Sequence, residues 1–207
     1  MVLGKGEQMR RSILYDLPDW PGWSGFMGMF DGCRDAPYPE DSKKYGTIIF
    51  EVGCREAEAI KLKPTMFRIN DEAIVGYNIP VLKKRSRATR MVVIKLDEQN
   101  PLGYDLVDYI ENCDTEYLLP GRRPFSREIV PSRHISPKTV YNRITEIHPD
   151  LWPQALRGYR ASMLVYERSF SVQDLVGWFN WKSADMALHY TKTRDMADAM
   201  GIKEVPR

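Results

Sequence analysis

The stretch from Gln154 to Tyr190 constrains this chain more than any other. It reads QALRGYRASMLVYERSFSVQDLVGWFNWKSADMALHY, and its apolar residues recur at helical spacing in three short segments. The segments also carry polar side chains that core packing does not explain: Arg157, Arg160, Trp181, Lys182 and Tyr190. Two arginines, an indole N–H and a phenol would together suit a phosphate group and an attacking oxygen. This is the hypothesis that the rest of the chain has to support.

Length and composition limit the class of protein. The chain has 207 residues, of which 43% are hydrophobic and 28% are charged, as expected of one folded globular domain with a sizeable core. No apolar run approaches the roughly 20 residues that span a bilayer, and no signal segment opens the chain. We therefore expect a protein without membrane contact.

Cysteine and histidine are scarce. Three cysteines without a C-x-x-C pair indicate a reduced, cytoplasmic environment and argue against a zinc site. With only three histidines, a histidine-based metal site would need most of them, so we expect neither a metal nor another cofactor. Carboxylate ligands are not excluded by this count.

Charge is unevenly distributed along a chain whose net charge is only +2. Basic residues are concentrated in two short stretches. The first contains Lys83, Lys84, Arg85, Arg87 and Arg90, and the second contains Arg122, Arg123, Arg127 and Arg133. Clusters of this kind are more often solvated faces than ligand sites. The mildly basic net charge is by itself no evidence for nucleic acid, but two such clusters on a nearly neutral chain indicate a polarised molecule.

The predicted architecture is mainly α with a small antiparallel β-hairpin or three-stranded sheet. Residues 1–40 are rich in Gly, Pro and aromatics, which predicts irregular structure with at most short helices, its aromatic rings packed on the domain. Residues 41–207 are expected to form the domain itself. In the β part, AIVGYNIPVL and TRMVVIKL flank the polar turn KKRSRA, so Lys83 and Lys84 would stand at a hairpin tip.

Helices are predicted on both sides of this sheet. SKKYGTIIFEVG should end at Gly53, and CREAEAIKLKP should form a second helix that Pro64 ends, with Arg55 at its start and Glu58 on the same face. PLGYDLVDYIENC and SPKTVYNRITEIHP have helical periodicity, the second with Ser136 as N-cap. The segment DTEYLLPGRRPFSREIVPSRHIS between them is predicted to be loop, and Ser183 is a candidate N-cap before Tyr190.

The order of these polar residues resembles the catalytic domain of tyrosine recombinases, the phage-integrase-like family, over roughly residue 41 to the C-terminus. GCREAEAIKLKP is similar to its first-arginine motif, LRGYRAS to the second-arginine motif in its archaeal spelling, and WFNWKSADMALHY to the box that ends in the nucleophile. Two features depart from the pattern. Gln154 stands where the family commonly has His or Lys, and we expect the N-terminal core-binding domain of a DNA clamp to be absent.

The resemblance implies a site-specific DNA recombinase or integrase from a virus, plasmid or other mobile element. Double-stranded DNA would be its partner, and it would self-associate as a dimer or tetramer on that DNA. Tyr190 would attack a DNA phosphodiester to give a 3′-phosphotyrosine and a free 5′-OH, and rejoining would need neither metal nor ATP. The implied catalytic set is Tyr190, Arg55, Arg157, Trp181, Lys84 and Gln154.

Other residues are expected in lesser roles. Glu58 and Arg160 would support the site, Arg160 by bracing it or touching the DNA backbone, and Lys83 is a less favoured alternative to Lys84 as proton donor. Phosphate contacts are expected from Lys83, Arg85, Arg87, Lys182 and Lys192. Alternatives are a type IB topoisomerase-like activity, a DNA-binding accessory protein with little or no catalysis, and a helical interaction module without a DNA role.

Overall fold

The computed structural model describes residues 20–83, 86–123 and 128–191. Its regular elements are α2 (Gly22–Phe30), η1 (Asp31–Asp35), α3 (Pro39–Val52), α4 (Glu56–Ala59), η2 (Pro64–Met66), β1 (Phe67–Ile69), β2 (Ala73–Lys83), β3 (Ser86–Lys95), α5 (Pro101–Glu111), β4 (Pro120–Arg122), β5 (Ile129–His134), α6 (Pro137–Thr145), α7 (Pro153–Tyr166) and α8 (Val172–Phe179). Residues 185–191 are also helical. No helix within the described ranges is long and apolar enough to cross a membrane.

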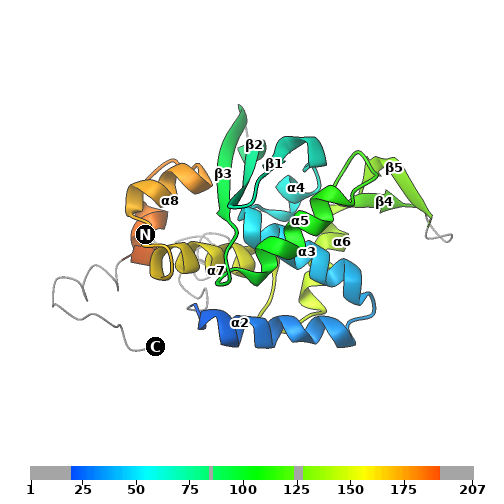
Figure 1. Cartoon of the computed structure of the whole chain (residues 1–207), viewed down its shortest axis with the longest axis horizontal. Helices are drawn as coiled ribbons and strands as arrows, with labels where there is room; N and C mark the ends of the chain where they lie inside the picture. The colour runs from blue at the N-terminus through cyan, green and yellow to red at the C-terminus, as the bar shows by residue number, and fades with distance from the viewer. Residues whose placement is uncertain (1–19, 84–85, 124–127, 192–207) are drawn as a thin grey trace, which may run out of the picture.

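Helices surround a central α3, and the small sheet stands at one side (Figure 1). This confirms the predicted helix-rich class with a small antiparallel sheet. α3 packs against α5, α6 and α7, and almost its whole second half is buried. It ends at Gly53, as predicted, where φ is 61°. A Cβ at Gly53 would lie 2.7 Å from the Phe179 ring, so both the backbone angle and the packing favour glycine there.

The sheet has strand order β1-β2-β3, with both pairs antiparallel. The predicted hairpin is confirmed, because β2 and β3 pair up to Lys83 and Ser86 on either side of the turn. Side chains alternate along β3: Arg90, Val92 and Ile94 point into the core, whereas Met91 and Val93 are exposed. Arg90 therefore belongs to the buried face of the sheet, although the sequence placed it in a basic cluster typical of solvated surfaces.

Two segments differ from the sequence prediction. The span predicted as loop contains the antiparallel pair β4–β5. Most β5 side chains are exposed and the strand contains Pro131, which is rare within strands, so no apolar alternation marked it in the sequence. α4 is a single turn and does not reach Pro64, because its backbone tightens into i→i+3 bonds and the buried Leu62 then pairs with Leu118.

The other helices follow the predicted segments closely. α2 packs Phe26 and Phe30 into the core, as expected of the N-terminal aromatics. The Ser136 hydroxyl caps α6 by accepting the Thr139 N–H, as predicted. Ser183 is not the N-cap of the last helix, since the first bond there runs from Leu188 N–H to the Ala184 carbonyl. The Ser183 hydroxyl instead donates to the Asp185 carboxylate.

An ion pair ties the end of the sheet to the end of α7. Arg168 donates two hydrogen bonds of 2.7 Å each to Asp97 and lowers the pKa of that carboxyl to about 2. Because the folded-state pKa lies below the unfolded value of about 3.9, the pair stabilises the fold above about pH 4, and the gain is lost as pH falls through 2.

We therefore expect Asp97→Asn to lower the free energy of unfolding by about 2 kcal/mol at pH 7 and by almost nothing below pH 2. Urea denaturation at several pH values measures this difference. Asp31→Asn is the matched control, because its pair with Arg34 is well exposed and should contribute less than about 0.5 kcal/mol. Equal losses in the two variants would contradict the assignment.

Candidate active site

Glu58 is the centre of the polar cluster at the start of α4. Its carboxylate accepts the Arg55 backbone N–H at 3.0 Å, the Arg55 guanidinium at 3.2 Å and the Leu82 backbone N–H at 3.1 Å. A second guanidinium, that of Arg157 on α7, lies 3.7 Å from the same carboxylate. Glu58 is buried, whereas Arg55 keeps 44% of its side chain exposed. One carboxylate thus holds two arginines that are about a hundred positions apart in sequence.

Arg157 is buried at the junction of two helix ends. Its guanidinium donates to the carbonyl of Gly53, after α3, and at 3.4 Å to that of Phe179, the last residue of α8. It also lies over the Phe179 ring, 4.6 Å from the centroid. Helix C-termini carry partial negative charge, which offsets part of the cost of burying the cation. Burial and the nearby Arg90 lower the pKa of Arg157 to about 9, so the group remains charged at neutral pH.

Arg90 is a third arginine at this junction, and sequence analysis did not include it in the site. It donates to the Val52 carbonyl at 2.7 Å, to the Gly53 carbonyl at 3.0 Å and to the Trp178 carbonyl. Arg90 and Arg157 therefore share the Gly53 carbonyl as an acceptor. The strand alternation of β3, in which Arg90 shares the parity of Val92 and Ile94, was the sequence signal that pointed to its burial.

Tyr190 joins this cluster through a stack of aromatic rings. The Phe179 and Trp181 rings are stacked at 4.6 Å, and Trp181 and Tyr190 at 5.9 Å with an interplanar angle of 9°. Tyr190 is only 8% exposed, and burial raises its pKa to about 12, against the opposing effect of the Arg157 charge. The phenol is therefore protonated at neutral pH, close to a cation that would favour its ionised form.

The structure places the remaining predicted residues unevenly. Gln154 lies half-buried one turn before Arg157 on α7, and Lys182 is exposed beside Trp181. Arg160 is fully buried away from the surface and pairs with Glu51 at 3.0 Å, so it can brace α7 but its side chain does not reach a DNA backbone. Lys84, Arg85 and Lys192 lie outside the described residues, as do the side chains of Lys83 and Arg87.

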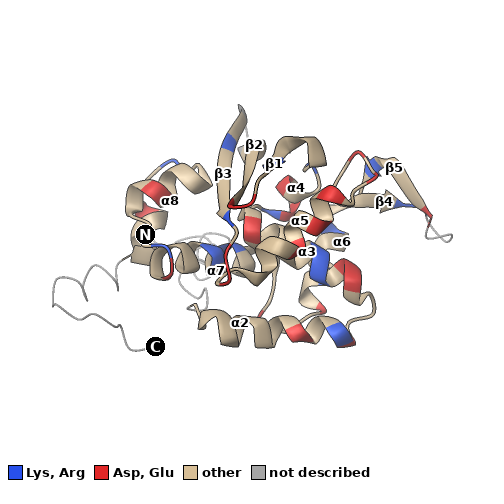
Figure 2. Cartoon of the chain, in the orientation of Figure 1, with Lys and Arg blue, Asp and Glu red and all other residues tan. Residues whose placement is uncertain are grey.

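Formal charges in the cluster do not balance. Arg55, Arg90 and Arg157 face one another across a single carboxylate, that of Glu58. Figure 2 shows the elements that supply them, with acidic positions on α4 and basic positions on α7 and β3. The excess of positive charge, with Arg55 exposed at its edge, suits an anion such as a phosphate. A buried phenol stands beside it.

The fold is that of the catalytic domain of tyrosine recombinases. XerH site-specific recombinase bound to its palindromic difH substrate matches with a TM-score of 0.62 at 15% identity, over 90% of this chain and 54% of that one. XerA recombinase matches with a TM-score of 0.60 at 16% identity, over 92% of this chain and 66% of that one.

A third match is a lambda integrase dimer bound to a core site, with a TM-score of 0.55 at 15% identity, over 90% of this chain and 49% of that one. The chain thus spans about half the length of XerH and of lambda integrase. No protein-family model matches the sequence, and no curated protein matches it significantly.

Proposed function

We propose that this chain is the catalytic part of a DNA recombinase or integrase of the archaeal type, which cuts and rejoins double-stranded DNA through Tyr190. The observation that carries the proposal is the arrangement of two motif arginines, Arg55 and Arg157, on one carboxylate and next to a buried tyrosine. These residues come from three distant parts of the sequence, and the fold brings them together. The matching fold of recombinases and integrases supports the same assignment.

The chemistry follows from the side chains. The Tyr190 oxygen would form a bond to a DNA phosphorus as the bond from phosphorus to the 5′ oxygen breaks. Negative charge that develops on the non-bridging oxygens would be stabilised by Arg55 and Arg157, with the Trp181 indole N–H as an uncharged donor. The phenol gives up its proton on attack and the leaving 5′ oxygen gains one. The product phosphotyrosine conserves the bond energy, so rejoining needs no ATP.

Lys84, which follows β2 in the sequence, is the proposed donor of a proton to the leaving oxygen. We expect Lys84→Ala to slow strand cleavage on the order of 100-fold or more, with little change in the dissociation constant for DNA. Rates of covalent adduct formation and filter binding measure the two effects. Lys182→Ala is the matched control: it removes an exposed lysine near Trp181 and should weaken binding more than cleavage. If Lys84→Ala lowered the cleavage rate and the DNA affinity by the same factor, Lys84 would be a phosphate contact and not the proton donor.

The test of the proposed function is a search for a covalent protein–DNA adduct. A pool of duplexes with randomised sequence and a nick is incubated with the protein, so that cleavage next to the nick releases a short strand and traps the intermediate. We expect DNA that stays attached to the protein after denaturation, and sequencing that DNA would define the target site. DNA retained only without denaturant would contradict cleavage and favour the accessory DNA-binding protein.

A further inference from the structure

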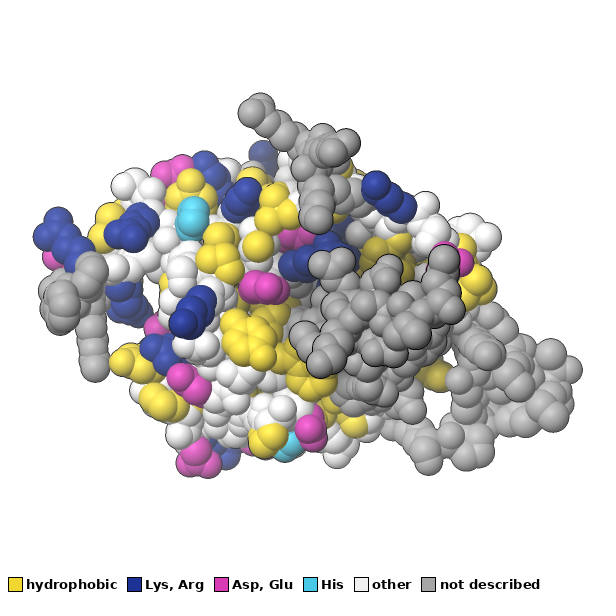
Figure 3. Space-filling view, turned by 180° about the vertical axis from the view of Figure 1, so that it is seen from behind, with side chains coloured by type: hydrophobic (Ala, Val, Ile, Leu, Met, Phe, Trp, Pro, Cys, Tyr) yellow, Lys and Arg dark blue, Asp and Glu magenta, His cyan; other side chains and the backbone are white. Residues whose placement is uncertain are grey.

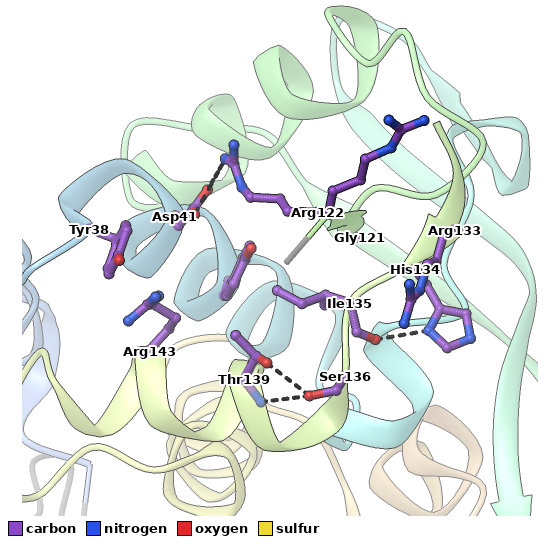
Figure 4. Close-up of a pocket in the computed structure, with 12 residues that line it drawn as sticks. Tyr38, Asp41, Gly121, Arg122, Arg133, His134, Ile135, Ser136, Thr139 and Arg143 are labelled. Atoms are coloured by element: carbon purple, nitrogen blue, oxygen red, sulfur yellow. Dashed lines mark hydrogen bonds and ion pairs between the residues drawn. The ribbon is translucent and has the colours of Figure 1, made fainter. Parts of the chain in front are cut away.

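A second basic pocket lies on the opposite half of α3 from the candidate active site. Its volume is about 410 Å³, and its walls come from the start of α3, the β4–β5 pair and the start of α6 (Figure 4). Four arginines line it together with a single carboxylate, that of Asp41; they are Arg122, Arg123, Arg133 and Arg143. The candidate active site uses none of these residues.

The arginines of this pocket differ in how firmly they are held. Arg143 is paired with Glu146 at 2.8 Å and stacked on Tyr38, 3.5 Å from the ring centroid. Arg122 reaches Asp41 at 3.3 Å, in a partly exposed pair that contributes no more than about 1 kcal/mol. Arg133 is exposed and has no ion-pair or hydrogen-bond partner in the described part of the chain. The Arg133 guanidinium is therefore free to bind a ligand.

Tyr45 adds a neutral donor to the pocket. The residue is only 2% exposed, yet its hydroxyl has no hydrogen-bond partner within the described ranges. Burial and the Asp41 charge raise the pKa of this phenol, so it keeps its proton and can donate a hydrogen bond to an oxygen atom. The hydroxyl lines the pocket and is available to donate to a ligand oxygen there.

The chemistry of the ligand follows from these groups. Guanidinium forks and a phenolic O–H can donate hydrogen bonds to the oxygens of a phosphate group, and the one carboxylate of the pocket, Asp41, is paired with Arg122. The volume exceeds that of a single phosphate, so the neighbouring sugars of a nucleic-acid strand have room. Lys and Arg side chains also gather on the half of the molecule that carries β4–β5 (Figure 3). A polyanion is therefore favoured over a small free anion.

The position of the pocket relates it to DNA. Tyr45 lies on α3 and Gly53 is the residue that caps its C-terminal end, eight positions further on, which corresponds to roughly 12 Å along the helix axis. That distance spans about three to four base-pair steps of a duplex at about 3.4 Å each. One strand could therefore present one phosphate at the active-site arginines and another at this pocket.

We propose that the pocket formed by α3, β4–β5 and α6 binds a backbone phosphate of the DNA, several nucleotides from the one that Tyr190 attacks, through Arg133, Arg122 and the Tyr45 hydroxyl. The inference rests on the proposed function, because it takes DNA as the ligand. It adds a second anchoring point that fixes the register of the duplex on the protein.

The test separates charge from hydrogen bonding by measuring affinity for a random-sequence duplex of roughly 20 base pairs, about two helical turns, at several salt concentrations. We expect Arg133→Ala to reduce the slope of log K against log salt by about 0.9, as the loss of one phosphate contact does. Tyr45→Phe should weaken binding roughly tenfold without changing that slope, because it removes a hydrogen bond and no charge. Arg34→Ala, on an exposed arginine outside the pocket, is the matched control and should leave the slope unchanged.

Several outcomes would overturn the proposal. One is a wild-type slope in Arg133→Ala together with wild-type affinity in Tyr45→Phe, and another is the same slope change in Arg34→Ala. Binding of inorganic phosphate that depends on Arg133, with no effect of Arg133→Ala on DNA, would make the pocket a free-anion site instead. If wild type still formed the covalent adduct with any of these results, the proposed cleavage function would stand and only the phosphate-binding pocket would be refuted. The two proposals can therefore be refuted separately.

Discussion

Tyr190→Phe should abolish the covalent adduct with DNA and leave binding of the same DNA unchanged. The substitution removes the attacking oxygen and keeps the ring that stacks on Trp181. The Tyr190 hydroxyl has no hydrogen-bond partner within the described part of the chain, so its loss should cost the fold little. Gel electrophoresis under denaturing conditions measures the adduct, and fluorescence anisotropy measures binding.

Tyr159→Phe provides a matched control for this prediction. Tyr159 is also buried, and burial likewise raises the pKa of its phenol to about 12, but it contacts the N-terminal aromatics Trp20 and Phe26 and not the arginine cluster. It should form the adduct as wild type does. An adduct in Tyr190→Phe would show that Tyr190 is not the nucleophile, and loss of the adduct in both variants would mean that the effect is not specific to Tyr190.

Arg90→Met should lower the free energy of unfolding by on the order of 3 kcal/mol or more. The methionine fills part of the space but leaves the buried carbonyls of Val52 and Trp178 without a donor, and each such group costs about 1–3 kcal/mol. The Gly53 carbonyl would keep only Arg157, so the ends of α3 and α8 would be held less firmly. Adduct formation should fall as well. Chemical denaturation and the adduct assay measure the two effects.

Arg68→Met is the control for the loss of an arginine from the same sheet. Arg68 is exposed on β1 and bonds only carbonyls of its own neighbourhood, those of Thr65 and Phe67. Its replacement should change stability by less than about 0.5 kcal/mol. Similar losses in the two variants, or a loss below about 1 kcal/mol for Arg90→Met, would mean that Arg90 does not tie the helix ends together.

Local patterns in the sequence predicted much of the fold. Gly53 ends α3, Ser136 caps α6, and the apolar strands around the KKRSRA turn pair as a hairpin, because each of these features is decided within a few residues. The β4–β5 pair escaped prediction for the opposite reason. Its strands are short and largely exposed, so they leave no periodic signal, and they form through pairing between segments of low intrinsic preference.

The candidate active site was likewise predictable from the sequence only in part. The motif spellings singled out Arg55, Arg157 and Tyr190, which the fold gathers into one cluster. They did not reveal that Glu58 is buried between the two arginines, because its burial depends on α4, the end of β2 and α7 meeting at one point. A pair of that kind at a surface would contribute little, whereas a buried carboxylate fixes both guanidinium groups.

By itself, the sequence determined the helix-rich class and the hairpin, and it predicted Arg55, Arg157 and Tyr190 as the motif residues. Only the tertiary structure decided what Arg90 and Arg160 do, since the sequence placed Arg90 in a cluster typical of solvated faces and left open whether Arg160 braces the site or touches DNA. Arg90 is buried because three carbonyls at two helix ends converge on it, and Arg160 because Glu51 meets it inside the core. Burying a charge requires partners from distant elements, and which elements meet is a property of the fold.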